Sequence, residues 1–331
     1  METTFSIRVI AIAAGLAIVA AVPALTARPG GAASRAASGA AAGVGVSQQA
    51  VGTAAQAAAV RYWTPGRMTR DLVRQPPPVT PPAWLSGDTL GAGLRWTHGG
   101  TVAAAVGRVF FTLGGADYVC SGALVGGAHP GVVLTAAHCV TGGPGRGRAT
   151  QWATNWVFVP GFADGRLPYG EYTAHSFLVP PEWAGPGGGE SDDFAFVQVT
   201  AATPTAGPDA AEPPHSSPHG LPVEFASGRD AAGLTRSYVF GYPAEPPYAG
   251  LYPVFCAGQV TVWAGSVRMP CDMTAGDSGG PWLAWFRPRS GSGLIAAVTT
   301  YKMSGDLAVL YGTVLGPRAR ALYQRAVRPA R

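Results

Sequence analysis

Short apolar runs rich in β-branched and aromatic residues alternate with Gly- and Pro-rich stretches from Trp96 to the end of the chain. Runs this short favour strands. Closely spaced strands without intervening helices are typical of an all-β sandwich or barrel and not of βαβ units. The runs that we expect to form strands are VGRVFFTL, YVCSGALV, GVVLTAAH, WVFV, DFAFVQV, SYVFGY, QVTVWAG, LIAAVTTY and AVLYGTVL.

One helix is expected, from Pro317 to Val327. Apolar residues such as Leu322 and Ala326 recur there at i, i+4 spacing, and a proline suits the first turn of a helix. The arginines of this stretch are interpreted as its solvated face. The Pro-, Ala- and Ser-rich residues 201–220 divide the strand-rich region into two halves.

The residues before Trp96 lack the strand pattern. In residues 1–27, Arg8 precedes an apolar run that ends before Pro23, which is the layout of a secretory signal peptide. Residues 28–94 are dominated first by Ala, Gly and Ser and then by Pro, and they are interpreted as a flexible pro-segment and linker. Residues 95–331 form the expected folded domain. Because an exposed arm is easily cut, we expect the isolated protein to begin between Arg61 and Val102.

Composition and charge agree with one large β domain. Hydrophobic residues make up 47% and charged residues 12%, and 47 Gly and 30 Pro provide frequent turns. The formal net charge is +5, of which residues 28–94 carry +4 and residues 95–331 carry +1. A nearly neutral folded region lacks the excess of basic residues that binds nucleic acid, so no nucleic-acid partner is expected.

The chain has four cysteines, Cys120, Cys139, Cys256 and Cys271, with no C-x-x-C pair. In the oxidising environment of an exported protein an even set should form disulfides. Four cysteines allow three pairings. The simplest is local, Cys120–Cys139 and Cys256–Cys271.

The stretch GDSGG around Ser278 raises the question of nucleophilic chemistry. A serine among glycines is commonly a turn residue, so partners are needed elsewhere in the chain. The same five residues match the G-x-S-x-G motif of α/β-hydrolases, in which the catalytic histidine comes after the serine in the chain. Here the last histidine is His219, so that fold is excluded.

His138 is the candidate general base. It ends the apolar run VVLTAAHCV directly before Cys139, whose disulfide would hold the ring in place. The alternative is a structural histidine at the end of a buried strand. Asp193 opens the apolar run DFAFVQV and could accept the other imidazole N–H from the edge of a core. Asp192 is expected to be a solvent-facing cap.

Taken in order, LTAAHC, DFAF and GDSGGP resemble the trypsin/chymotrypsin family of serine peptidases. The flanking CSGALV, GYP and DMTAGDSGGPW are most similar to its secreted bacterial members. The resemblance implies an all-β fold of two six-stranded antiparallel β-barrels (chymotrypsin-like) with a short C-terminal helix. It also implies that His138 is the base, Asp193 the orienting acid and Ser278 the nucleophile, at the junction of the barrels.

The resemblance implies further features of the site. The backbone N–H groups of Gly276 and Ser278 would form the oxyanion hole, and Cys120–Cys139 would match the family's histidine-loop disulfide. No IVGG-like sequence follows a basic cleavage site, so the sequence does not predict an activation switch in which a new N-terminal amine pairs with Asp277. Asp277 then needs another partner, for which an arginine is one option.

The specificity pocket departs from the family pattern. Asp272 lies where trypsin-like members carry the aspartate that pairs with Arg or Lys of the substrate. Cys271 lies seven residues before Ser278, whereas animal trypsins place a cysteine four residues before, and this difference could turn Asp272 away. The opposite wall is expected to include Thr299, Thr300, Tyr301 and Lys302. The lysine could neutralise Asp272 or favour an acidic residue. Cleavage after Arg or Lys, or after a medium-sized apolar residue, therefore stays open.

The sequence thus predicts a secreted serine endopeptidase that hydrolyses polypeptides through an acyl-enzyme. No cofactor, no metal and no membrane association after signal removal are expected, and the protein should be a monomer. His215 and His219 have a zinc-like spacing, but Pro218 argues against the helix that this spacing requires. The alternatives are an inactive secreted β-barrel binding protein and an esterase-like acyl hydrolase that uses the same site.

Overall fold

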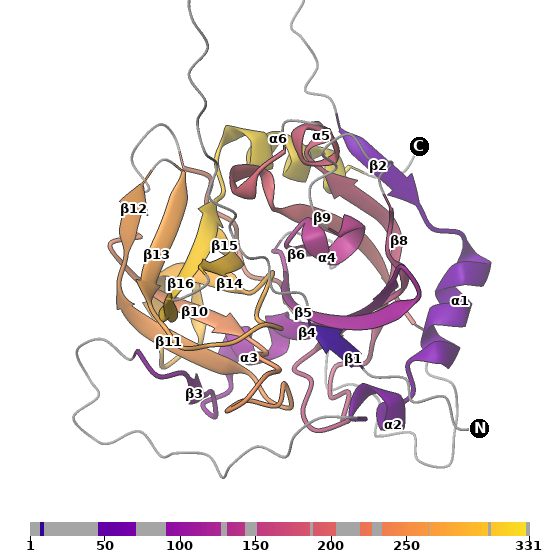
Figure 1. Cartoon of the computed structure of the whole chain (residues 1–331), viewed down its shortest axis with the longest axis horizontal. Coiled ribbons are helices and arrows are strands. Elements are labelled where there is room, and N and C mark those ends of the chain that lie inside the picture. The colour runs from indigo at the N-terminus through magenta and orange to yellow at the C-terminus, as the bar shows by residue number, and fades with distance from the viewer. Residues whose placement is uncertain are drawn as a thin grey trace, which may run out of the picture.

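The computed structural model describes residues 7–9, 46–70, 91–126, 131–142, 151–185, 188–202, 219–226, 234–263, 265–303 and 306–328. The expected signal peptide (apart from 7–9), the Ala-rich part of the arm before residue 46, the linker 71–90 and His215 lie outside the described residues. Two strand-rich bodies lie side by side (Figure 1).

The first half of the strand-rich region closes into a barrel of six antiparallel strands. They pair in the order β5-β4-β7-β8-β9-β6, and β6 pairs again with β5, which closes the ring. Inward-facing residues such as Val109, Phe158 and Val197 are fully buried in its core. The strands are β4 (Val106–Leu113), β5 (Ala116–Leu124), β6 (Val132–Thr135), β7 (Thr154–Pro160), β8 (Tyr172–Val179) and β9 (Ala195–Ala201).

The second half forms a curled antiparallel sheet in the order β12-β13-β16-β15-β14-β10-β11-β3. It has its own core, which includes Val239, Met269 and Trp282. The two-barrel, mostly β fold that the sequence predicts is therefore confirmed. The strands are β3 (Leu94–Arg95), β10 (Arg236–Gly241), β11 (Val254–Gln259), β12 (Thr261–Trp263), β13 (Ser266–Pro270), β14 (Pro281–Arg287), β15 (Ser292–Met303) and β16 (Asp306–Val314).

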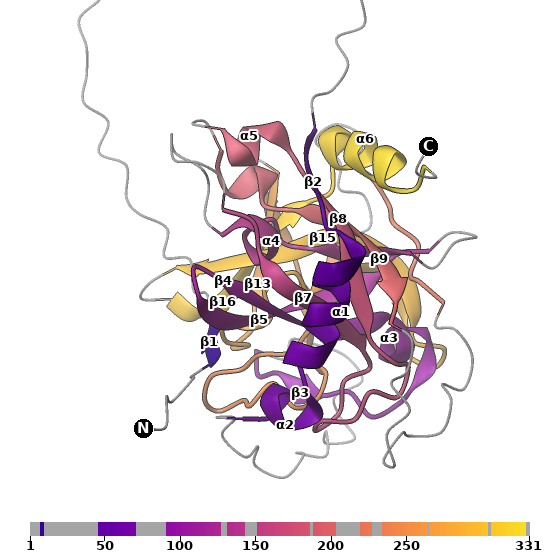
Figure 2. The same cartoon turned by 90° about the vertical axis from the view of Figure 1, so that its right-hand side faces the viewer.

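The C-terminal helix α6 (Pro317–Ala326) confirms the predicted helix. It follows β16 of the second sheet but returns to the first barrel, where Leu322 and Ala326 are buried (Figure 2). The Gln198 side chain of β9 donates to the carbonyl of Ala326 at 2.9 Å. The other short helices are α3 (Gly100–Ala105), α4 (His138–Thr141), α5 (Pro181–Ala184) and the 3₁₀ turn η1 (Glu190–Asp192).

The segment of residues 46–70, called the N-terminal segment below, departs from the flexible arm that the sequence predicts. It contains β2 (Ser47–Ala50), α1 (Thr53–Tyr62) and α2 (Pro65–Met68), and β2 pairs antiparallel with β8. The alanines of α1 are small enough to let the helix lie close to β7 and β8. The large apolar side chains come after them, and Trp63 and Met68 are buried. The segment is therefore part of the folded body.

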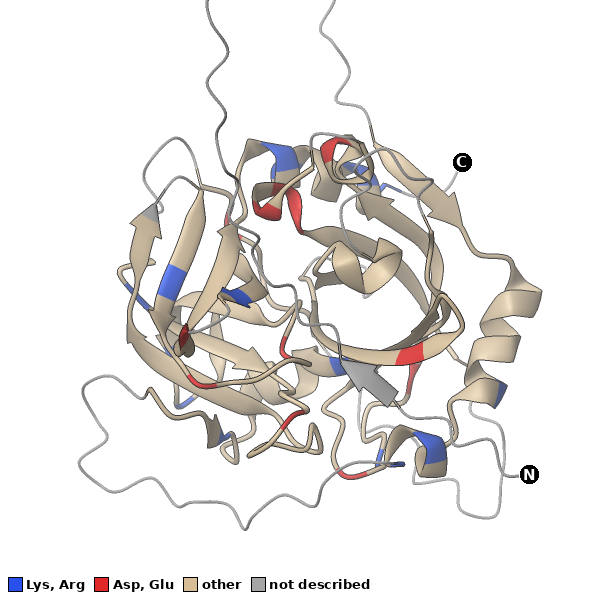
Figure 3. Cartoon of the chain, viewed as in Figure 1, with Lys and Arg blue, Asp and Glu red and all other residues tan. Residues whose placement is uncertain are grey.

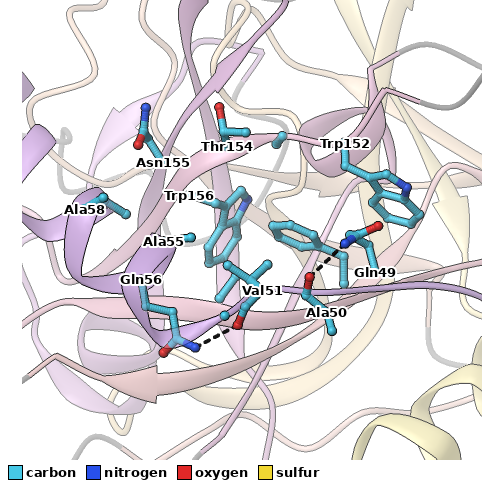
Figure 4. A pocket seen from close by; sticks show the side chains of 15 residues that line it. Gln49, Ala50, Val51, Ala55, Gln56, Ala58, Trp152, Thr154, Asn155 and Trp156 are labelled. Atoms are coloured by element: carbon cyan, nitrogen blue, oxygen red, sulfur yellow. Dashed lines mark hydrogen bonds between the residues drawn. The ribbon is translucent and has the colours of Figure 1, made fainter.

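A cavity of about 330 Å³ separates the N-terminal segment from the barrel. Figure 4 shows Val51 and Ala55 of the segment close to Trp156 of β7, and Trp152 near Gln49. Beyond it, the Trp63 indole donates to the Asn155 carbonyl at 2.5 Å. The first strand, β1 (Ile7–Val9), pairs parallel with β5.

An ion pair closes the other end of the N-terminal segment. The Arg67 guanidinium donates to Asp117 Oδ2 at 2.8 Å, and the Tyr62 hydroxyl donates to Asp117 Oδ1 at 2.8 Å. Asp117 is buried, and Thr112 also donates to it at 2.9 Å. Charged residues are otherwise scattered over both barrels (Figure 3). Among the described residues, no helix is both long and apolar enough to cross a membrane.

Candidate active site

His138 and Asp193 meet in a buried hydrogen bond. His138 opens α4, directly after β6, and its Nδ1 lies 2.7 Å from Asp193 Oδ2. The backbone N–H of His138 donates to the other carboxylate oxygen at 2.9 Å. A carboxylate only accepts, so Nδ1 carries the proton and Nε2 is left as the acceptor. Nε2 is buried and has no hydrogen-bond partner among the described residues.

The turn that carries Asp193 is held by the C-terminal helix. Asp193 follows η1 and precedes β9. Its neighbour Asp192 is buried and accepts from Arg318 of α6 at 2.6 Å. The prediction of a solvent-facing Asp192 is therefore wrong, because α6 returns to this turn and supplies a cation.

Ser278 lies in the loop between β13 and β14 and is 6% exposed. Its carbonyl accepts from the backbone N–H of Ser121 in β5 at 2.7 Å. The next residue, Gly279, has φ +85°, and a Cβ there would lie 2.3 Å from Thr135 Oγ1. Thr135 ends β6, just before His138. The structure thus brings the serine loop against the segment that carries His138.

Gly276 has φ +106°, a conformation that glycine adopts without strain. Its carbonyl accepts from Ser121 Oγ at 2.8 Å, which fixes the orientation of the peptide. The intervening Asp277 amide donates to the Thr274 carbonyl at 3.4 Å, whereas the described residues offer no acceptor to the amides of Gly276 and Ser278. These two amides remain available to a ligand.

Both expected disulfides are present. Cys120–Cys139 joins β5 to α4 beside His138, and Cys256–Cys271 joins β11 to the end of β13. The His138 ring and the sulfurs of Cys120 and Cys139 lie within 4.8 Å of one another. Because sulfur binds metals as a thiolate and these two sulfurs are joined to each other, the cluster is not a metal site.

A cavity of about 180 Å³ opens beside Ser278. Of the residues predicted for a specificity pocket, Asp272, Thr300, Tyr301 and Lys302 line it. Thr299 lies behind the wall, where its hydroxyl accepts from the Trp282 indole at 3.0 Å. The sequence did not indicate the other lining residues, which are Glu245, Pro246, Thr274, Ala275, Asp277 and Leu307.

Asp272 and Lys302 each have partners within the protein. Asp272 Oδ1 accepts from the Tyr248 hydroxyl at 2.5 Å and from the Gly93 amide at 2.7 Å. The Lys302 ammonium donates to the Cys271 carbonyl at 2.7 Å and to the carbonyl of Leu307. Both side chains are therefore held in place before any substrate enters.

Asp277 is buried beside the serine, and its Oδ2 has no hydrogen-bond partner among the described residues. Burial raises its pKa to about 7, against the field of Lys302, which lowers it. Burial also lowers the pKa of Lys302, while the charge of Asp277 raises it. Among the described residues, the cation whose charge acts on Asp277 is therefore Lys302 of the cavity.

Arg108 of β4 links the first barrel to the wall of the cavity. It is fully buried, and its guanidinium donates to the Gly250 carbonyl at 2.7 Å. Burial lowers its pKa to about 9. Gly250 belongs to the loop between β10 and β11, which also carries Glu245 and Pro246. No local pattern in the sequence points to this contact, because its partners are far apart in the chain.

Comparisons with known proteins agree with this geometry. Residues 120–284 match the model of the trypsin-like peptidase domain, a range that contains His138, Asp193 and Ser278. Among solved structures, the protease Anisep from Arthrobacter nicotinovorans is 33% identical, with a TM-score of 0.57, over 68% of this chain and 96% of that chain. The thermostable serine protease AL20 from an extremophilic microorganism is 26% identical, with a TM-score of 0.57, over 69% of this chain and 100% of that one.

A Glu endopeptidase in complex with MPD, 18% identical with a TM-score of 0.50 over 73% of this chain and 97% of that one, shares the fold alone. No curated protein matches the chain.

Proposed function

Since the chain belongs to the trypsin-like peptidase family, we propose that it is an exported serine endopeptidase that works through His138, Asp193 and Ser278. The observation that carries the proposal is the buried hydrogen bond from His138 Nδ1 to Asp193, which leaves Nε2 free to accept a proton. A fixed acid–histidine pair beside a serine is the arrangement that activates a hydroxyl nucleophile.

The first half of the reaction follows from these groups. As Ser278 Oγ forms a bond to the carbonyl carbon of the substrate, its proton passes to His138 Nε2, and Asp193 stabilises the resulting imidazolium. The carbonyl electron pair moves to its oxygen, where the amides of Gly276 and Ser278 donate hydrogen bonds. When the C–N bond breaks, the leaving amine takes the proton from Nε2. An ester on Ser278 remains.

The second half repeats these steps with water. His138 Nε2 takes a proton from water as its oxygen bonds to the ester carbon. The proton then returns to Ser278 Oγ as the C–O bond breaks and the acid product leaves. The loop around Gly276 and Ser278 stabilises the same developing charge in both halves, because the carbonyl oxygen occupies one position throughout.

Export and processing belong to the same proposal. Residues 1–27 act as a signal peptide and residues 28–94 as a pro-segment and linker, of which residues 46–70 pack on the first barrel, and the peptidase domain works outside the cell as a monomer. The two disulfides support this, because such bonds persist in oxidising compartments.

A fluorophosphonate probe tests the nucleophile. We expect one label on the purified protein and none on Ser278→Ala, with the exposed Ser290→Ala as the matched control that keeps its label. Asp193→Asn should lower kcat by about four orders of magnitude, because the imidazole loses its orienting acid. Asp192→Asn should change kcat only a few-fold.

Labelling that survives Ser278→Ala would refute the mechanism. Cleavage of esters but of no peptide in a broad panel would instead favour the acyl-hydrolase alternative. A protein that neither reacts with the probe nor cleaves any substrate would favour the binding protein.

A further inference from the structure

The cavity beside Ser278 contains its own cation. Its lining includes three carboxylates, those of Glu245, Asp272 and Asp277, and the single ammonium of Lys302. Glu245 is exposed at the rim, whereas Asp277 is 4% exposed. The charge in the deeper part of the cavity is therefore set by Asp272, Asp277 and Lys302.

Lys302 is anchored inside the cavity by two carbonyl groups. One belongs to Cys271, 2.7 Å from Nζ, and the other to Leu307. Cys271 comes directly before Asp272, and its amide donates to the Ala308 carbonyl of β16 at 2.7 Å, so the two carbonyls that hold Lys302 belong to paired segments. The ammonium is thus fixed at the wall of the cavity where β16 meets the residue before Asp272.

The carboxylates of the cavity depend on this lysine to different degrees. Asp272 already accepts two hydrogen bonds through Oδ1, from the Tyr248 hydroxyl and the Gly93 amide. Asp277 Oδ2 receives none from the described residues. Ionising a buried carboxylate with one unpaired oxygen is costly unless a cation is near, and the field of Lys302 is the largest influence that favours the charged form of Asp277.

We propose that Lys302 determines the substrate specificity of the cavity, by occupying the position that a substrate's lysine or arginine would need and so selecting an uncharged side chain. The inference rests on the proposed function, since it concerns the side chain that precedes the bond cleaved by Ser278. The substrates are then polypeptides with an uncharged residue of moderate size at that position.

Charge excludes both kinds of ionic side chain. A second cation in the cavity would be repelled by the Lys302 ammonium and would compete with it for the charges of Asp272 and Asp277, which already act on Lys302. An acidic side chain would approach Lys302 but also Asp272, which repels it, and Asp277, which repels it when ionised. An uncharged side chain encounters neither penalty. Specificity then comes mainly from rejection of the wrong partner.

Peptides that differ only at the residue before the cleaved bond provide the test. We expect wild-type kcat/KM to be roughly 10- to 100-fold higher for acetyl-lysine and norleucine than for lysine, since the three share a similar chain but differ in charge. Glutamate should also be poor. In Lys302→Met the ratio of kcat/KM for norleucine to kcat/KM for lysine should fall about 10-fold or more. The matched variant Lys302→Arg should retain it.

A wild-type enzyme that cleaves best after Lys, Arg or Glu would overturn the inference, as would a Lys302→Met variant with an unchanged lysine-to-norleucine ratio. The rate of fluorophosphonate labelling reports whether each variant has a folded site. If Lys302→Met does not fold, the wild-type comparison of lysine with acetyl-lysine decides alone. A labelled wild-type enzyme that prefers arginine refutes the role of Lys302, whereas a wild-type protein without labelling or cleavage refutes the proposed function.

Discussion

Asp277 gives the site a pH dependence at the scale of a single residue. Its pKa is raised from 3.8 to about 7 by burial, so the folded protein holds this proton more tightly than the unfolded chain does. The stabilisation that the proton provides is complete below pH ~4 and is lost as the pH rises through about 7. We therefore expect the free energy of unfolding of the wild type to fall over this range relative to Asp277→Asn, which cannot ionise.

Urea unfolding of both proteins between pH 4 and 8, followed by tryptophan fluorescence, measures the difference. Parallel pH profiles would contradict the raised pKa. Lys302→Met should steepen the wild-type loss, because the field of Lys302 opposes the effect of burial on Asp277.

Residues of the site differ in how far the sequence could predict them. His138, Asp193 and Ser278 each stand in a distinctive local stretch, so their grouping could be predicted before any geometry was known. Ser121 could not, because its bonds to the loop of Gly276 and Ser278 join segments far apart in the chain. The local sequence specifies a turn or a strand, but a side-chain hydrogen bond between the two barrels depends on tertiary packing.

At the scale of elements, the two disulfides should have similar effects on stability but different effects on activity. They close loops of 19 and 15 residues, for which loss of the cross-link costs about 3 kcal/mol. Cys120–Cys139 holds α4, which carries His138, whereas Cys256–Cys271 joins two strands of the second sheet. We expect Cys120→Ala/Cys139→Ala to lower kcat as well as stability.

The matched pair Cys256→Ala/Cys271→Ala should lose stability and change kcat less. Guanidinium unfolding and steady-state kinetics of both variants check this, and peptide mapping without reductant verifies the wild-type pairing. A larger loss of kcat in the second pair would show that α4 does not need its cross-link.

The strands and α6 follow from hydrophobic pattern, but the N-terminal segment does not. Its Ala-rich composition predicts a flexible arm, yet α1 uses the small size of its alanines to approach β7 and β8. Trp63 and Met68 then supply the buried contacts. Two residues hardly change the composition of the segment, so composition alone does not indicate them. Pattern predicts an element best when its own side chains form the core, and poorly when the element covers a surface built by others.

At the scale of the whole molecule, the N-terminal segment should contribute to the stability of the peptidase domain. A chain that begins at Gly91 loses the Trp63 side chain, whose burial is worth about 3–5 kcal/mol, and leaves the buried Asp117 without Arg67. A chain that begins at Val46 keeps both. We therefore expect the shorter chain to unfold at lower denaturant concentration, although the segment lies away from the junction of the barrels.

Denaturant curves of the two chains, with Trp63→Ala in the longer one as a control, provide the measurement. Equal midpoints would show that the segment is dispensable. A cut between Arg70 and Gly91 should leave the segment bound, so the two pieces should elute together under native conditions and separate in urea.

The return of α6 to the first barrel also has a consequence for when activity can arise during synthesis. Asp192, beside the carboxylate that orients His138, receives its cation from Arg318, which is close to the C-terminus. Arg318 is made after the segments that carry His138, Asp193 and Ser278, and it follows the last strand, β16, by only a few residues. The turn beside Asp193 therefore gains this contact only when the second sheet is complete.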